Sequence, residues 1–218
     1  ALTAAENQKG CNTDMKKKLI LLIPLTIGIC SVFYALSVQK DLSDELIRLH
    51  IIANSDSEYD QDLKLKVRDR ICSEVGAEFA AISDKDEYRR ALMNKTEKIQ
   101  KIADSVLSES DAGYKSRVSL ERLYIPRKSY DGIILPEGSY EGLIVRLGDA
   151  SGKNWWCVVY PPLCFTESTC GSLSPEAKEY LKSHLSAESY SLITEEGIEI
   201  KYKFKLIEAI QKAKKIFS

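Results

Sequence analysis

Cysteine and histidine are the residue types in this chain that could supply a nucleophile, a general base or a metal ligand. The 218 residues include six cysteines and two histidines, His50 and His184. A Cys-His hydrolase would use Cys157 or Cys164 as its nucleophile. Neither lies at a predicted helix start, where a thiolate is favoured, because Cys157 belongs to a predicted strand and Cys164 follows two prolines. The cysteines therefore argue against catalysis, and a hydrolase stays only as an alternative.

The motifs that mark common enzymes and metal sites are absent from the sequence. It contains no glycine-rich phosphate loop, no His-Glu-x-x-His and no Gly-x-Ser-x-Gly. The cysteines never have Cys-x-x-Cys spacing and the two histidines are remote from each other, which disfavours a zinc site. With 31 basic and 32 acidic residues, an electrostatically driven nucleic-acid binder is not expected. We predict no catalytic residue, cofactor, metal, nucleic acid or small-molecule ligand.

An uncharged run over residues 19–37 follows three lysines, Lys16 to Lys18. A run of this length is roughly what a helix needs to cross a hydrocarbon core of about 30 Å. The lysines should stay cytoplasmic and direct the rest of the chain outward, whereas a buried cytosolic helix would not need them. The run is predicted to be a membrane anchor or, because Ala35-Leu36-Ser37 resembles a signal-peptidase site, a cleaved signal. Residues 1–18 would then be a cytoplasmic extension and 38–45 a linker.

Export changes what the four downstream cysteines can do, because disulfides persist outside the cytosol. Cys157 and Cys164 would close a short loop if Pro161-Pro162 reverses the chain between them. Cys72 and Cys170 would remain as a second pair. The alternative is that these cysteines are free, buried thiols.

The stretch from Asn154 to Tyr160 contains both tryptophans and is predicted to be a strand. Because its two faces are both apolar, we expect it to lie centrally in a sheet. Residues 148–152, rich in glycine, are predicted to join it as a hairpin to a strand over 140–147. An alternative use of the aromatic residues is that Trp156 or Phe165 presents a face to a partner.

Hydrophobic periodicity organises the rest of the chain. Apolar residues recur at helical spacing from Leu63 and again from Tyr88, with Gly113 as a predicted stop. The expected elements are a strand over 45–53, helices opening at Ser57 and Ser83, a strand over 115–123, a short helix opening at Ser174-Pro175, a strand over 198–204 and a closing helix over 206–217. This grouping predicts an α+β exported domain over residues 46–218, with a mainly antiparallel sheet covered by a helical hairpin.

Three stretches of the chain resemble the stage II sporulation protein R family of endospore-forming Firmicutes. They are Asn-Trp-Trp-Cys-Val-x-x-Pro-Pro-Leu-Cys-Phe over 154–165, Ile-Arg-Leu-His-Ile-Ile-Ala-Asn-Ser-Asp-Ser over 47–57 with its continuation to Asp69, and Pro-Glu-Gly-x-Tyr-Glu over 136–141. The resemblance runs from about Leu46 to Phe165.

The resemblance implies a signalling protein that the forespore exports into the space between the two compartments. There it would trigger a mother-cell membrane protease, stage II sporulation protein GA, which resembles aspartic proteases and removes the pro-sequence of sigma factor E. The residues expected to contact this receptor lie along a charged edge of the domain, next to two aromatic residues. Arginine and tryptophan are frequent at binding hot spots, which favours this surface. They are Arg48, His50, Asn54, Asp56, Trp156 and Phe165. The rival functions are a cell-envelope hydrolase active during septum remodelling and a structural envelope module.

Overall fold

The computed structural model describes residues 22, 26–130, 133–161, 163 and 175–194. The chain divides into two units, one formed by residues 1–38 with 198–218 and the other by residues 39–197. In the first unit, residues 26–38 are helical. Within the described ranges, no helix is both long and apolar enough to span a membrane, and residues 19–21 and 23–25 of the predicted anchor lie outside those ranges.

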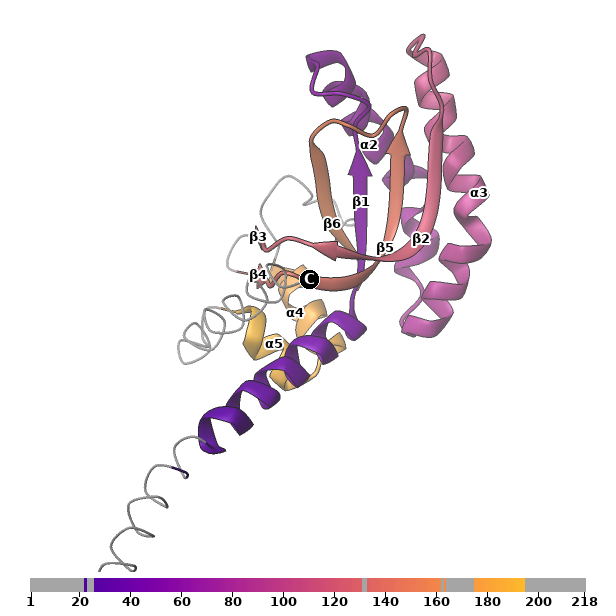
Figure 1. Ribbon diagram of the computed structural model, residues 1–218. Helices are drawn as coiled ribbons and strands as arrows, with labels where there is room; N and C mark the ends of the chain where they lie inside the picture. Colours follow the sequence, from indigo (N-terminus) through magenta and orange to yellow (C-terminus); the bar gives the residue numbers. More distant parts are fainter. Residues whose placement is uncertain (1–21, 23–25, 131–132, 162, 164–174, 195–218) are drawn as a thin grey trace, which may run out of the picture. The chain divides into compact units, whose positions relative to one another are not determined.

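The second unit contains a four-stranded sheet in the order β2-β5-β1-β6 (Figure 1). The strand β1 pairs in parallel with β5 and antiparallel with β6, and β2 pairs antiparallel with β5. A separate two-stranded ribbon is formed by β3 and β4. The strands are β1 (Ile47–Ile52), β2 (Ser116–Ile125), β3 (Lys128–Tyr130), β4 (Ile133–Leu135), β5 (Gly138–Leu147) and β6 (Asn154–Tyr160). The predicted α+β class is confirmed, with a sheet that is mixed and mostly antiparallel.

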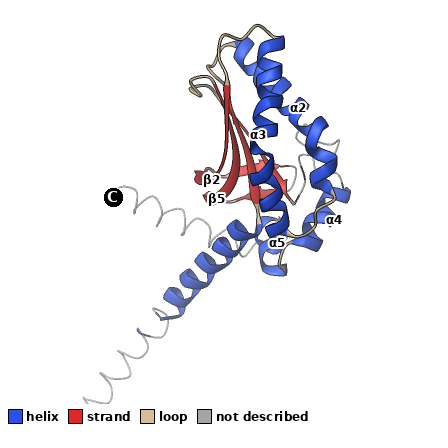
Figure 2. Ribbon diagram, turned by 90° about the vertical axis from the view of Figure 1, so that its right-hand side faces the viewer, coloured by secondary structure: helices blue, strands red, loops and turns tan. Residues whose placement is uncertain are grey.

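The helices are α2 (Glu58–Ala80), α3 (Lys85–Glu109), α4 (Pro175–His184) and α5 (Ala187–Ile193). The long pair α2 and α3 lies on one face of the sheet, as predicted (Figure 2). Their spacing of apolar residues produces this packing, because the stripes that begin at Leu63 and Tyr88 are buried against the strands. The remaining buried members of these stripes are Val67, Ile71, Val75, Phe79, Leu92, Ile99, Ile102 and Val106.

The ends of the long helices differ slightly from the prediction. Ser57 caps α2 and accepts a hydrogen bond from the backbone of Asp60, as expected, but α3 is capped by Asp84 and not by Ser83. The predicted stop at Gly113 is also wrong, because α3 ends at Glu109 and Asp111 adopts the left-handed conformation at φ 56°. The helix α4 begins at Pro175 as predicted, whereas α5, β3 and β4 were not predicted. The expected elements over 198–204 and 206–217 lie outside the described residues.

The predicted β5–β6 hairpin and the central place of the tryptophan strand are both wrong. The strand β1 lies between β5 and β6, and β6 is at the edge of the described sheet. The connection over residues 148–152 therefore crosses the end of β1, where Ser151 N donates to Asn54 O at 3.1 Å and Gly152 N donates to Ala53 O at 3.0 Å. The physical reason is burial: five of the six β1 residues are buried, whereas the first half of β6 is exposed or half-buried.

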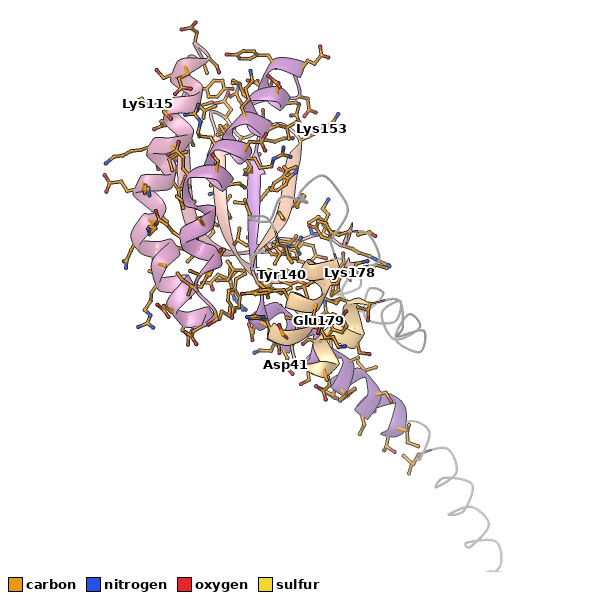
Figure 3. The ribbon with its side chains drawn as sticks, turned by 180° about the vertical axis from the view of Figure 1, so that it is seen from behind. Asp41, Lys115, Tyr140, Lys153, Lys178 and Glu179 are labelled. Atoms are coloured by element: carbon orange, nitrogen blue, oxygen red, sulfur yellow. The ribbon has the colours of Figure 1, made fainter. Side chains whose placement is uncertain are left out.

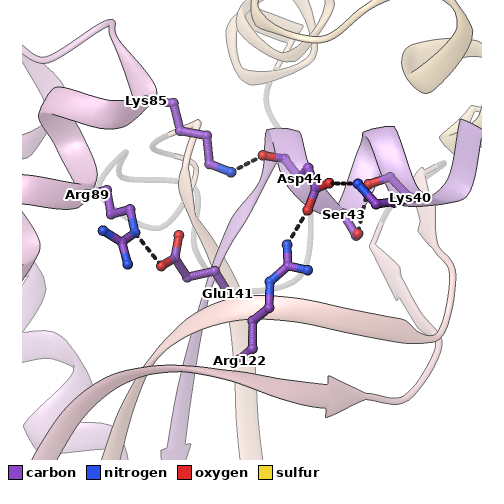
Figure 4. A network of polar contacts seen from close by, with 7 residues as sticks. All are labelled: Lys40, Ser43, Asp44, Lys85, Arg89, Arg122 and Glu141. Atoms are coloured by element: carbon purple, nitrogen blue, oxygen red, sulfur yellow. Dashed lines mark hydrogen bonds and ion pairs between the residues drawn. The ribbon is translucent and has the colours of Figure 1, made fainter.

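Residues 39–45, within the predicted linker, are helical and are fixed to the domain by a polar network around Asp44 (Figure 4). Its carboxylate pairs with Lys40 at 2.6 Å and with Arg122 of β2, and its backbone oxygen accepts a hydrogen bond from Lys85 of α3. The hydrogen bond from Lys40 lowers the pKa of Asp44, and Arg122 adds to this effect against the opposing burial. Seen from behind, Asp41 lies near one end of the domain, and Lys153 lies near the other (Figure 3).

Candidate functional site

The face of the sheet opposite α2 and α3 carries the polar residues that the sequence singled out. Side chains alternate along a strand, so the core-facing Ile47, Leu49 and Ile51 leave Arg48 and His50 on the other face. We call it the helix-free face because neither of the two long described helices, α2 and α3, lies on it. Two rows of side chains cross it in strand order. They are Ser119, Ile144, His50 and Trp156, and Arg117, Arg146, Ile52 and Asn154.

Arg48 is fully buried, with 0% of its surface exposed. Its Nε donates to Cys157 O at 3.1 Å and its Nη2 donates to the hydroxyl of Tyr130 at 3.0 Å. The guanidinium also lies over the ring of Tyr140, 5.3 Å from the centroid, in a cation–π contact. The predicted receptor contact by Arg48 therefore does not fit this structure, in which the side chain joins β1, β6 and the β3–β4 ribbon.

His50 is also buried, with 5% of its surface exposed. Its imidazole stacks on the indole of Trp156, with 3.6 Å between ring centroids and 14° between planes. Burial lowers the pKa of His50 to about 4, and the nearby cations Arg146, Arg48 and Lys128 add to this effect against a contribution from Asn154. The ring is consequently neutral at neutral pH, and it supports the half-buried indole from the strand beside it.

Positive side chains surround this stack. The ammonium of Lys128, on β3, lies 5.7 Å from the centroid of the Trp156 ring. On the other side, Arg146 donates to Glu121 Oε1 at 2.5 Å and to Ser119 Oγ at 2.9 Å. Lys128 and Arg146 thus form a cationic surface around the stacked rings of His50 and Trp156. Such a surface suits binding of an anionic group more than catalysis.

Asn54 and Asp56 lie in the loop after β1 and hold the crossover between β5 and β6. Asn54 Oδ1 accepts a hydrogen bond from Asp149 N at 2.9 Å, and Asp56 Oδ1 accepts one from Lys153 N at 2.7 Å. These contacts give both side chains a structural role. Asp56 is exposed and Asn54 half-buried, so the loop is separate from the stack around His50.

Sequence reasoning missed the residue to which this loop bonds, Asp60, which is buried in the first turn of α2. Burial opposes its ionisation, but hydrogen bonds led by Ser55, Tyr114 and Asn54 outweigh that effect and lower the pKa of Asp60. The signal available in the sequence was the Ser57-x-x-Asp60 spacing, which predicted a helix cap but not the contacts from Tyr114.

Two of the four disulfide candidates can be placed. Cys72 is a free, half-buried thiol on α2, so the predicted Cys72–Cys170 pair does not form in this structure. Burial raises the pKa of Cys72 to about 11, which makes it unreactive at neutral pH. Cys157 lies on β6 among the residues packed against the core. Cys164, Cys170 and the predicted contact Phe165 lie outside the described residues, so the Cys157–Cys164 pairing stays a prediction.

Comparison with known proteins assigns the family. The family model described as stage II sporulation protein R matches residues 43–170. The chain belongs to the stage II sporulation protein R family. Stage II sporulation protein R of Bacillus subtilis (strain 168) is 31% identical over 175 residues, which cover 76% of this chain and 78% of that protein. No solved structure matches the chain.

The family match includes the whole described sheet, from β1 to β6, and therefore both the cationic surface and the crossover loop. The resemblance noted in the three sequence motifs is thus confirmed. Cys157 packs against the core while His50 lies on the opposite face of the sheet, so they do not form a nucleophile–base pair. Across the described ranges, no group of three His, Cys, Asp or Glu side chains could hold a metal ion.

Proposed function

We propose that this chain is an exported sporulation signal that activates the membrane-embedded aspartic-type protease stage II sporulation protein GA. The activated protease would then process pro-sigma-E in the mother cell. The observation that carries the proposal is membership of the stage II sporulation protein R family over residues 43–170, together with the Bacillus subtilis relative. The aromatic and cationic surface supports it, because a domain that signals by being bound needs an accessible face of this kind.

The proposed location is the space between forespore and mother cell. The uncharged run over 19–37 behind three lysines supports export, with the domain either kept at the membrane or released by cleavage near Ser37. The polar network around Asp44 attaches the helix over 39–45, which follows this run, to β2 and α3.

Activation by binding requires contacts that are better in the competent state of the protease than in its idle state. Buried Arg48 and His50 cannot supply such contacts directly, because they have 0% and 5% of their surface exposed. Their role is to hold the surface around Trp156 in place. The contact itself is assigned to the half-exposed residues of the helix-free face, such as Lys128 and Trp156.

Reconstitution in a non-sporulating cell tests the function. The chain is produced with stage II sporulation protein GA and pro-sigma-E, and the cleaved sigma factor is measured by immunoblot. The matched control deletes residues 16–37, which belong to a unit separate from the domain of residues 39–197 and whose loss should keep that domain inside the cell. We expect cleavage only with the exported chain. Equal cleavage with the retained chain, or none with a folded and exported one, would reject the proposal.

A further inference from the structure

The helix-free face of the sheet carries positive charge that the described residues do not neutralise. Arg48 is the extreme case, because within the described ranges its buried guanidinium bonds only to the neutral oxygens of Cys157 and Tyr130. Its Nη1 has no hydrogen-bond partner among the described residues. A buried cation normally has a carboxylate partner. Within the described residues, no carboxylate bonds to the Arg48 guanidinium.

His50 gives a second observation at the same place. It is 95% buried, since 5% of its surface is exposed, and within the described part of the chain neither ring nitrogen makes a well-formed hydrogen bond, although the Asn154 side chain is close enough to act on the ring. Buried polar atoms without partners are rare and unfavourable. The charged groups that act on the ring, Arg146, Arg48 and Lys128, are all cations. The surroundings of His50 are therefore short of an anion.

The accessible charges on this face are also unbalanced. Lys128 lies over Trp156 and has no ion pair with a described residue, and Arg117 is exposed beside Arg146 in the pairing register. Among the helix-free side chains of the four described sheet strands, Glu121 is the carboxylate, and it is bound by Arg146. This part of the face thus has three accessible cations, Arg117, Lys128 and Arg146, and one carboxylate, Glu121. We name this area, made of Arg117, Lys128 and Arg146 around the His50–Trp156 stack, the cationic face.

We propose that the cationic face binds an acidic segment of the partner protein, with one carboxylate held between Lys128 and Arg146 over the indole of Trp156. The inference rests on the proposed function, whose receptor contact it identifies chemically as an acidic stretch of the protease outside the mother-cell cytoplasm. Arginine and tryptophan are favoured interface residues, and such charge pairs govern specificity and association rate. An anionic membrane fits less well, because lipid-binding surfaces usually cluster four to eight lysines and arginines.

The binding test uses the full chain and a dye-labelled hexaglutamate peptide, with hexaglutamine as the neutral probe. Fluorescence anisotropy gives the affinity, and emission of the two tryptophans reports on the site. We expect hexaglutamate alone to bind, more weakly as salt rises. Lys128→Gln should weaken binding at least fivefold, whereas Lys101→Gln, an exposed lysine on α3, should leave it unchanged. Glu121→Gln releases Arg146 from its acid and should tighten binding at least twofold.

Three results would overturn the inference. Equal affinity of Lys128→Gln and Lys101→Gln would place the peptide elsewhere, and equal binding of hexaglutamine would remove the role of charge. Phosphatidylglycerol vesicles that bind through Lys128 while hexaglutamate does not would assign the face to a membrane. In the reconstituted cell, full sigma-factor cleavage by an exported Lys128→Glu chain would reject this surface and leave the proposed function intact. Failure of the unchanged chain to give cleavage would instead reject the function.

Discussion

The imidazole of His50 lies flat against the indole of Trp156, with ring centroids 3.6 Å apart and planes 14° from parallel. The two residues come from neighbouring antiparallel strands and face each other directly in the register of β1 and β6. His50 is buried and Trp156 is half-buried, so the pair connects the interior of the protein with the cationic face. The stack makes the position of Trp156 depend on a residue that can titrate.

Acidification should destabilise the fold through His50. The unfolded chain binds a proton near the ordinary pKa of 6.5, whereas the folded chain binds it only near 4. Between these values the unfolded state holds more protons, so stability is complete above the unfolded pKa and falls as the pH drops through this window. From neutral pH to about pH 5, this residue should lower the free energy of unfolding by about 2 kcal/mol.

Urea unfolding at several pH values measures this effect, and His50→Phe is the matched control because it keeps a flat ring without a titrating group. The pH dependence of the unfolding free energy should be weaker in His50→Phe by about the stated amount. The nuclear magnetic resonance signal of the His50 ring should titrate near pH 4. Identical pH profiles for the two chains, or a ring that titrates near 6.5, would contradict the buried stack.

Arg48→Ala should lower the free energy of unfolding, and any loss of signalling should follow from that loss of stability. The change removes two hydrogen bonds and the contact with Tyr140, and it leaves a buried void, for a loss of about 2 to 4 kcal/mol. The control is Arg117→Ala on the same face, which is exposed and should change stability by no more than about 0.5 kcal/mol. Urea unfolding followed by tryptophan emission compares the two. A fully stable Arg48→Ala chain that no longer triggers sigma-factor processing would show that Arg48 contacts the receptor after all.

The two long helices could be predicted because helix periodicity is local information. The stripes from Leu63 and from Tyr88 each repeat within one segment, and both are buried as expected. The order of the strands could not be predicted in the same way. Residues 148–152 have the composition of a tight turn, but β1, about a hundred residues earlier, inserts between the strands that they join.

The burial of Arg48 could not be predicted for a related reason. An arginine in a strand is normally exposed, so Arg48 was predicted to lie at the surface. The groups that permit its burial, Tyr130 and Tyr140, come from distant parts of the chain, and nothing near Arg48 indicates them. Lys128 was missed because the β3–β4 ribbon that carries it is only three residues long on each side. Trp156 was named because its residue type alone is informative, and its contact with a receptor stays a prediction.

The crossover predicts a strong effect of adding one methyl group to the loop. A Cβ at Gly152 would come within 2.1 Å of Ser55 O, which is backbone and cannot move aside, so Gly152→Ala should destabilise the fold by about 2 kcal/mol or more. Gly113→Ala is the control, because a Cβ there meets nothing within 4 Å, and it should be neutral or slightly stabilising. Thermal unfolding of both variants decides this. A neutral Gly152→Ala would mean that the loop does not cross β1 as described.

The free state of Cys72 makes a prediction about the oxidised protein. Its thiol is half-buried with a pKa near 11, so alkylation of the folded chain should be slow at neutral pH and should become complete in denaturant. Mass spectrometry of a non-reducing digest should then find Cys72 alkylated, even in protein recovered after export into an oxidising compartment. Cys72→Ala is the companion variant, and it should leave both non-reducing mobility and unfolding under oxidising conditions close to those of the unchanged chain. If Cys72→Ala released a free thiol at Cys170, the two cysteines would be paired in the exported protein, and the packing of α2 would have to differ from the one described.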